Sequence, residues 1–491
     1  MSTYTGHGAY ARTGVAGARV PAKSRSAIVY IGTAPVHTVE GGTKNVNKPV
    51  LVSSFAEAKK KFGYDEEWLY TLSEPMHYHM EEMGVGPLVL INVFDPMTDA
   101  DEEETAELTP AGGRILLADA ENVILDTVSI EGVDGGAYFK EYNPEAKTLS
   151  LREKKKGTLG TEKKTVKYRK TSGAEGVTTE TVIGATDGEG MNTGLYTIMN
   201  VYQETGYIPA YLVVPGFSKE KSVHNVMAEV TKKINGHWDA YMMTEMPVTD
   251  DVTLSTAGEW KKTNGYTCDN ETVSWPCIQG RDGRKHSLPV LRAAALQKIL
   301  IETDGVPYRT ASNTECSVIE NLYMGEGNEG RVFTDDLIGE KLNAHGIASA
   351  AYVGGRWALW GAHSADYDEE TASSVNVAET SRMMLYYISN DFQHRRARNV
   401  DEPMTMNDLN RIASEEQARL DALVKIGALT YGKVVFNASE DARSDILMGD
   451  FAFSFEITTT PLAKKLTADV YWTDKGFETY IGAFKEVGEA D

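Results

Sequence analysis

The sequence predicts an α/β core, a mixed sheet flanked by helices, with an inserted small all-β domain and extended N- and C-terminal arms. Apolar runs such as SAIVYIGTA and GPLVLINVF alternate with amphipathic helical segments, as in a sheet that is covered on both faces. A block of short β-branched segments interrupts this pattern. The first 25 residues, rich in Gly and Ala, have too little apolar surface to bury themselves.

Changes in composition divide the 491 residues into consecutive parts. An N-terminal linker arm covers residues 1–25. The α/β core covers 26–105 and 184–400, on either side of a β-rich insertion at 106–183. A C-terminal domain, with a helix and a terminal β-hairpin or arm, covers 401–491.

In the first part of the core, SAIVYIGTA and GPLVLINVF each predict a buried strand. Between them, SSFAEAKKKFG predicts a helix that begins after the N-cap Ser54, uses Glu57 to close a capping box and ends at Gly63. The acidic, proline-bounded segment 95–110 is predicted to be a linker.

The insertion contains short segments separated by Gly, Asn and Asp, which predicts a small all-β module. Its predicted strands are NVILDTVSI, AYFKEY, KTLSLRE, KTVKYRK and GVTTETVI. Residues 151–170 carry nine Lys or Arg and two Glu. This run is either an anion-binding face or the solvated side of a β-hairpin that turns at 157–160, and the alternation along 165–168 favours the hairpin.

The α/β pattern then resumes. A strand at 208–214, a helix that runs from Val223 to Ile234 and the strand in WDAYMMTEMP together predict a βαβ unit. Further helices are predicted at 291–301 and in DLIGEKLNAHGI, which runs into SAAYVGGRWALWGA. Two longer helices follow around 383–392 and 409–424, the second of which opens at Thr405 with Asp408 three residues on.

Two alternating segments, DFAFSFEITTT and KLTADVYWTD, predict a terminal β-hairpin. Such a hairpin presents one apolar face and hydrogen-bonding edges that another element must cover. Its apolar positions are Phe451, Phe453, Phe455, Ile457, Leu466, Ala468, Val470 and Trp472.

Charge and composition exclude several classes of partner. A net charge of −22 repels phosphate backbones and anionic lipid, so we expect no nucleic-acid binding and no direct membrane insertion. No apolar run is long enough to span a bilayer, and the N-terminus lacks the apolar stretch of a signal peptide. Cys268, Cys277 and Cys316 lack C-x-x-C spacing, so we expect reduced thiols in a cytoplasmically made protein.

No motif indicates catalysis. GEGNEG has the spacing of a dinucleotide-binding loop, but its glutamates would face the pyrophosphate. His77 and His79 are two residues apart, which does not suit joint zinc ligation from a helix, and we expect them to be interfacial or solvated. We therefore predict that the chain is not an enzyme and has no catalytic residue, cofactor or metal site. A ligand-binding α/β enzyme is the less favoured alternative.

The end of the helix around 383–392 is basic. Its sequence FQHRRARN groups His394, Arg395, Arg396 and Arg398. We expect these side chains to cap the helix, because the C-terminal end of a helix carries partial negative charge. The alternative is an electrostatic contact with an acidic partner surface.

Several stretches follow one another in a characteristic order. They are YTGHGAYARTGVAG, KPVLVSSFAEAKKKFG, LSEPMHYHMEEMGVGPLVLINVFD, IGATDGEGMNTGLYTIMNVYQETGYIPAYLVVPG and LNAHGIASAAYVGGRWALWGAHSAD. In this order they resemble the tail sheath proteins of contractile phage tails and related contractile injection particles. The chain departs from the family pattern at His7, where proline is usual, and at His363, where arginine is common. The resemblance covers most of 3–474 apart from the insertion.

The resemblance implies a structural subunit of a contractile tail sheath. Such a subunit polymerises as a helical array of stacked rings around an inner tube and contracts, driven by stored conformational energy, to push the tube through a target cell envelope. The implied partners are other copies of the chain, the inner tail tube protein, and baseplate and tail terminator proteins. The implied location is a virion tail or tail-like particle, made and assembled in the bacterial host cytoplasm. Another phage tail or baseplate structural protein is the alternative.

The resemblance also implies that both ends add strands to sheets of neighbouring subunits, that the insertion faces outward and that the tube lies near 409–424. The poor apolar content of the arm and the uncovered hairpin suit strand addition, so we expect 3–20 of one copy to pair with the C-terminal strands of adjacent copies. The residues expected in this intersubunit strand pairing are Tyr4, Ala9, Tyr10, Val15, Val20, Phe451, Phe453, Phe455, Ile457, Val470 and Trp472.

Overall fold

The computed structural model describes residues 25–327, 333–370, 372–373, 375–436, 448–477 and 481. By its internal contacts the chain divides into two compact units, Met1–Thr459 and Thr460–Asp491. All the strands and helices named below lie in the first unit. None of the helices in the described ranges combines the length and the apolar character needed to cross a bilayer.

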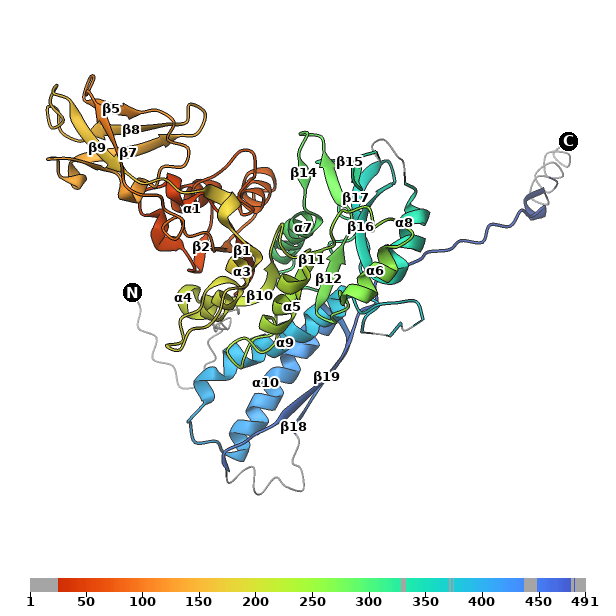
Figure 1. The fold of residues 1–491 in the computed structure, drawn as a ribbon. Coiled ribbons are helices and arrows are strands. Elements are labelled where there is room, and N and C mark those ends of the chain that lie inside the picture. Colours follow the sequence, from red (N-terminus) through yellow and green to blue (C-terminus); the bar gives the residue numbers. More distant parts are fainter. Residues whose placement is uncertain are drawn as a thin grey trace, which may run out of the picture. The chain divides into compact units, whose positions relative to one another are not determined.

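An eight-stranded mixed sheet forms the centre of the first unit (Figure 1). Its inner strands pair in parallel, and an antiparallel strand closes each edge. In spatial order the strands are β17 (Arg356–Trp360), β16 (Ile347–Val353), β12 (Glu271–Ser274), β11 (Tyr241–Glu245), β10 (Ile208–Val213), β1 (Ser26–Gly32), β3 (Leu88–Asn92) and β2 (Val50–Val52).

Helices cover both faces of this sheet, which explains its continuous apolar strands. On β1, Ile28 and Tyr30 face one core cluster, whereas Val29 and Ile31 face the other. Buried side chains of α7 belong to the first cluster and those of α5 to the second. The α-helices are α1 (Phe55–Phe62), α2 (Ser73–His77), α3 (Thr179–Ile183), α4 (Val201–Thr205), α5 (Lys221–Val230), α6 (Ala257–Asn264), α7 (Leu288–Glu302), α8 (Asp335–Lys341), α9 (Glu379–Arg396) and α10 (Met406–Lys425).

Most predicted core elements are confirmed, with local differences at their ends. Strand β10, helix α5 and strand β11 form the predicted βαβ unit, but α5 ends at Val230 and Ile234 instead bridges to Trp238. Ser54 caps α1 as predicted, whereas the carboxylate of Glu57 accepts its backbone hydrogen bond from Ser53. A further small sheet joins β14 (Lys285–His286), β13 (Cys277–Gly280) and β15 (Ile319–Tyr323).

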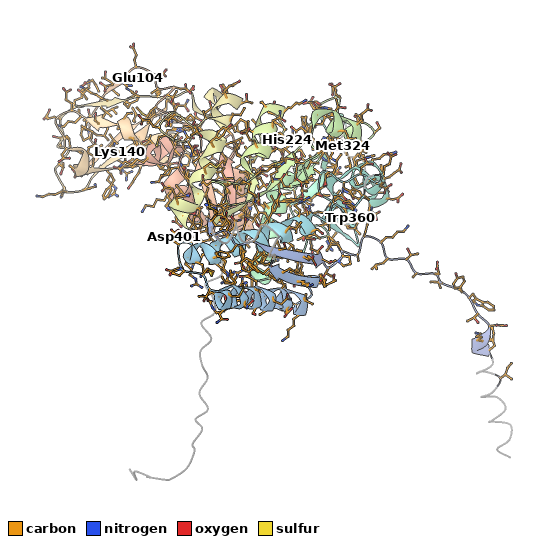
Figure 2. The ribbon with its side chains drawn as sticks, turned by 90° about the horizontal axis from the view of Figure 1, so that it is seen from below. Glu104, Lys140, His224, Met324, Trp360 and Asp401 are labelled. Atoms are coloured by element: carbon orange, nitrogen blue, oxygen red, sulfur yellow. The ribbon has the colours of Figure 1, made fainter. Side chains whose placement is uncertain are left out.

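The insertion folds as two three-stranded antiparallel sheets around a core cluster of its own. Glu104 and Lys140 mark this region in Figure 2. One sheet contains β4 (Glu104–Leu108), β9 (Lys164–Tyr168) and β6 (Ser129–Ile130), and the other contains β5 (Arg114–Leu117), β8 (Thr148–Glu153) and β7 (Tyr138–Asn143).

Three expectations for this part of the chain are wrong. The predicted linker 95–110 contains β4, which pairs with β9 and places its glutamates near lysines of the basic run. The predicted hairpin at 157–160 does not form, because β8 and β9 belong to different sheets and the connecting loop buries Leu159 in the shared core. GVTTETVI forms the helix α3 rather than a strand, because the Thr178 hydroxyl caps its first turn and Gly184 ends it.

The predicted terminal hairpin is also wrong. Strand β19 (Phe453–Thr459) pairs antiparallel with β18 (Leu429–Phe436), which precedes it in the chain. Among the described residues after Thr459, none forms a strand. The preceding helix α10 begins as predicted, with a capping box between Thr405 and Asp408.

His79 lies in the core rather than at a surface. It is fully buried, and its Nε2 lies 2.7 Å from the Tyr30 hydroxyl. Burial lowers the pKa of His79 to about 3, and its Nδ1 has no hydrogen-bond partner that could share a second proton. The folded protein therefore holds this histidine neutral.

A neutral buried histidine makes stability depend on pH. Because the unfolded chain binds a proton near pH 6.5 and the folded chain only near pH 3, stability is complete above pH 6.5 and falls on acidification. Replacing His79 with Gln removes this titration while keeping a hydrogen-bonding group. We expect the wild type to lose about 2 kcal/mol more than H79Q between pH 7 and pH 5. Urea unfolding at both pH values measures the difference, and equal losses would contradict the prediction.

Candidate subunit interface

The two-stranded sheet β18–β19 is the candidate interface, because β19 carries three of the residues that the sequence predicts for intersubunit pairing, Phe453, Phe455 and Ile457. Figure 1 shows α9, α10 and the two strands running together. In their register Gly432 lies opposite Ile457 and Val434 opposite Phe455. The apolar side of β19 packs against Phe392 of α9, whose ring centroid lies 6.0 Å from that of Phe453 and 5.3 Å from that of Phe455.

Helix α9 is anchored to the central sheet at its first residue. Glu379 is buried, and its carboxylate lies 2.9 to 3.0 Å from Nη2 of the buried Arg292 on α7. The hydroxyls of Thr272 on β12 and Thr310 donate to the same carboxylate at 2.7 and 2.6 Å. Two residues further along α9, the hydroxyl of Ser381 lies 2.8 Å from that of Thr459 at the end of β19. The start of α9 thus connects the central sheet to the candidate interface.

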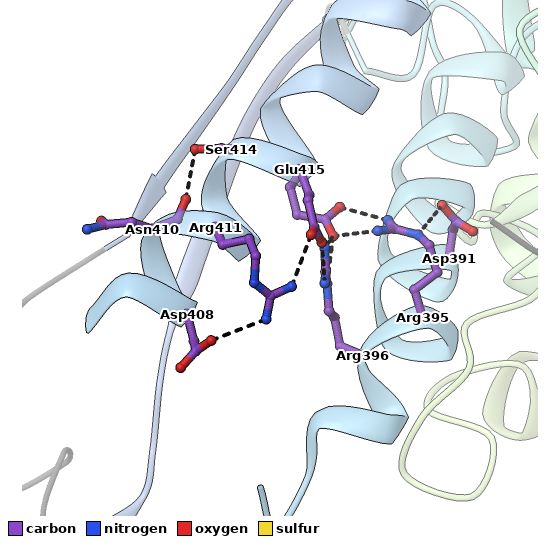
Figure 3. A network of polar contacts seen from close by, with 9 residues as sticks. Asp391, Arg395, Arg396, Asp408, Asn410, Arg411, Ser414 and Glu415 are labelled. Carbon is purple, nitrogen blue, oxygen red and sulfur yellow. Dashed lines mark hydrogen bonds and ion pairs between the residues drawn. The ribbon is translucent and has the colours of Figure 1, made fainter. Parts of the chain in front are cut away.

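At its other end α9 is joined to α10 by charged side chains (Figure 3). The carboxylate of Glu416, whose side chain is 1% exposed, accepts hydrogen bonds from Arg395 and from Arg396. Asp391 accepts from Arg395 Nε at 3.0 Å and from Arg419. The expected cap or partner contact of the basic cluster is therefore replaced, for Arg395 and Arg396, by ion pairs within the chain.

Because Glu416 is buried beside two cations, its removal leaves their charge partly uncompensated. We expect Glu416→Gln to lower the free energy of unfolding by about 3 kcal/mol. The matched control is Arg411→Ala, which breaks an exposed pair with Glu415 on the same helix and should cost less than about 1 kcal/mol. Urea unfolding of the three proteins provides the measurement. A loss in E416Q no larger than in R411A would show that the buried network does not hold the two helices together.

The predicted interface residues divide into three groups. Tyr4, Ala9, Tyr10, Val15 and Val20 lie outside the described residues. Phe451, Phe453, Phe455 and Ile457 are half-buried, and the last three are on β19. Val470 and Trp472 are 92% and 81% exposed and belong to no strand. The structure therefore brings together the β19 residues, and it does so against α9 of the same chain.

Sequence reasoning missed β18, the partner of β19. Its sequence LTYGKVVF contains the β-branched and aromatic residues that favour strands. Gly432 interrupts the alternation, and the structure shows why glycine stands there. A Cβ at this position would lie 2.9 Å from the Cβ of Leu420 on α10. The glycine lets the helix lie close against the strand.

Within the described residues one group combines three metal-ligand types. His224, Cys268 and Glu271 place ligand atoms within 4.8 Å of one another, and Figure 2 labels His224. The carboxylate of Glu271 already has partners in His224 Nε2 at 2.9 Å, the Thr244 hydroxyl and the Cys268 backbone N–H. Burial raises the pKa of the Cys268 thiol to about 12, so the thiolate that a metal needs is disfavoured. These contacts are those of a hydrogen-bonded buried pair, and we assign no metal to it.

Comparison with known proteins identifies the class. No protein-family model matches the chain. The tail sheath protein of Burkholderia phage BcepMu is 23% identical over 482 residues, which cover 93% of this chain and 94% of that protein. The major tail sheath protein of Serratia phage KSP20 is 21% identical over 313 residues, covering 63% of this chain and 74% of that protein.

Solved structures share the fold. The sheath complex of the extracellular contractile injection system PVC in its contracted state matches with a TM-score of 0.55 at 11% identity, covering 97% of this chain and all of that one. The contracted helical sheath of the anti-feeding prophage matches with a TM-score of 0.54 at 10% identity, covering 96% and 100%. The chain therefore has the fold of sheath subunits of contractile particles. Along nearly its whole length the chain is similar to a tail sheath protein, a member of the family that its motifs resemble.

Proposed function

We propose that copies of this sheath subunit assemble as a helical array of stacked rings around an inner tail tube and contract to drive the tube through a target cell envelope. The observation that carries the proposal is the homology to tail sheath proteins over almost the whole chain. Further partners under this proposal are the baseplate and tail terminator proteins. The particle, a phage tail or a tail-like injection device, assembles in the bacterial host cytoplasm.

The energy for contraction comes from the packing of the subunits. If the extended array is metastable and the contracted array buries more surface between copies, a trigger at the baseplate releases the difference without nucleotide hydrolysis. Each subunit needs to contribute only a few kcal/mol, because the same bistable contact repeats along the array. The rigid joint between α9 and α10 supports this role, since a subunit that moves as a body transmits force to its neighbours.

Strand addition links the copies. Residues 3–20 of one copy pair with the C-terminal strands of an adjacent copy, and the segment with Val470 and Trp472 makes a second link. The exposure of these two side chains supports the second link, because large apolar groups at a surface favour burial by a partner. The insertion faces outward, and the region of α10 faces the tube.

Deletion of residues 1–20 tests the linkage. Because residues 1–20 are rich in Gly and Ala and have little apolar surface to bury, the truncated subunit should fold with an unchanged unfolding midpoint. It should not polymerise, because each copy has lost the strand that it adds to its neighbour. Negative-stain electron microscopy of the purified proteins is the measurement: full-length protein should form hollow cylinders and the truncated protein none. Cylinders of normal length from the truncated protein would show that the N-terminal segment is dispensable.

A further inference from the structure

The insertion separates opposite charges at the two ends of its β4–β9 pair. Residues 152–164 contain six basic and two acidic side chains, a net charge of +4. Residues 95–104, the acidic run, contain six acidic and no basic side chains, a net charge of −6. In the antiparallel register the first residue of β4, Glu104, lies opposite the last residue of β9, Tyr168. The acidic run therefore leads into β4 at one end of the pair, and the basic segment leads into β9 at the other.

The distance between these two surfaces keeps them from neutralising each other within one copy. The strands β4 and β9 pair over five residues. At about 3.4 Å per residue, the pair is about 14 Å long. The Debye length is about 8 Å at physiological ionic strength, so exposed charges at this separation are largely screened from each other. Each surface thus keeps its charge for a partner at short range.

The basic end is built around the tip loop, residues 154–163. The carboxylate of Glu153 accepts hydrogen bonds from the backbone N–H groups of Gly157 at 3.0 Å and of Leu159 at 3.1 Å. The side chain of Leu159 is fully buried in the core of the insertion. These contacts fix the backbone of the loop, so a partner that binds the loop does not have to order it first.

The tip loop exposes lysines at three positions, Lys155, Lys156 and Lys163. The ammonium of Lys163 lies 3.9 Å from the carboxylate of Glu107 on β4. Glu153 is the acidic residue nearest in the sequence to the other two lysines, and its carboxylate is engaged by the loop backbone. Lys155 and Lys156 are therefore the cations of the loop that are best placed to bind an acidic partner.

The partner that fits both charged surfaces is a second copy of the chain. Every copy carries the acidic run, in which Asp99, Asp101, Glu102 and Glu103 are exposed. The charges of the two surfaces, +4 and −6, are opposite in sign and similar in size. An anionic lipid surface would match only the tip loop and would be repelled by the acidic run, whereas a second copy matches both.

We propose that the tip loop of one copy binds the acidic run of a neighbouring copy in the assembled array, with Lys155 and Lys156 paired to carboxylates of residues 101–103. The inference rests on the proposed function and adds to it a contact between insertions, away from both arms. Because the two surfaces differ, the contact is head-to-tail and repeats from copy to copy. At short range it offsets the repulsion between copies that each carry a net charge of −22.

Zero-length cross-linking tests the contact without any substitution. A carbodiimide joins a lysine to a carboxylate only where the two groups touch. Cylinders are assembled from equal amounts of unlabelled and isotope-labelled protein, cross-linked, digested and analysed by mass spectrometry. We expect mixed-isotope links between Lys155 or Lys156 and residues 101–103.

The same experiment separates failure of the inference from failure of the proposed function. Cylinders that contain no mixed-isotope link between these segments would overturn the inference and leave the proposed function intact. Links in which both segments always carry the same isotope would place the contact within one copy and would overturn the inference as well. If no cylinders form, the proposed function is overturned, and the inference with it.

Charge reversal tests whether the contact stabilises the array. Lys155→Glu with Lys156→Glu, and separately Glu102→Lys with Glu103→Lys, each place like charges opposite one another. We expect each double variant to raise the critical concentration for cylinder formation about tenfold at low salt, measured by sedimentation. Combining the two double variants restores opposite charges and should bring the critical concentration back to within about twofold of the wild type.

Lys219→Glu with Lys221→Glu is the matched control, because both lysines are exposed but lie outside the insertion. This variant changes the net charge as much as the tip-loop variant does, and should keep the critical concentration within about twofold of the wild type. Urea unfolding checks that every variant folds. Unchanged critical concentrations in the two double variants, or a combined variant that assembles no better than either of them, would overturn the inference.

Discussion

The buried pair between Arg292 and Glu379 is the interaction on which the C-terminal part of the first unit depends. Desolvating both charges is costly, and the cost is offset because the carboxylate also receives two threonine hydroxyls. The pair joins α7, β12 and the start of α9, so the direction in which α9 leaves the central sheet is set inside the core. Removing one partner would bury an unpaired charge, a far larger penalty than losing a surface pair.

Helix α9, fixed at its start by this pair, in turn positions α10 and the β18–β19 sheet. The helix carries Phe392, which packs against β19, and ends in the arginines that bind Glu416 of α10. Helix α10 in turn lies against β18 at Gly432. The small sheet is therefore held on a rigid helical pair rather than on loops, as a subunit that transmits force through its contacts requires.

A two-stranded sheet is marginal by itself and has two edges that can recruit another strand. In this chain α10 supports the sheet, and the Gln417 side chain of α10 hydrogen bonds to the backbone of β18. The proposed helical array requires heterologous, head-to-tail contacts, which propagate as helices when they do not close into rings.

The sequence by itself determined the elements whose signal is local. The apolar strands of the central sheet, the caps at Ser54 and Thr405 and the βαβ unit follow from residue spacing, and the order of motifs indicated the likeness to tail sheath proteins. It could not determine strand pairing. Alternation shows that β19 is a strand with one apolar face, but its partner β18 lies across 16 intervening residues, and the equally alternating segment with Val470 and Trp472 forms no strand. The same limit applies to charge. The basic run at 394–398 predicts a helix cap or a contact with a partner surface, and only the fold brings Glu416 beside it. Pairing and burial depend on contacts between residues distant in the chain, whereas periodicity and capping depend on neighbours within a turn or two.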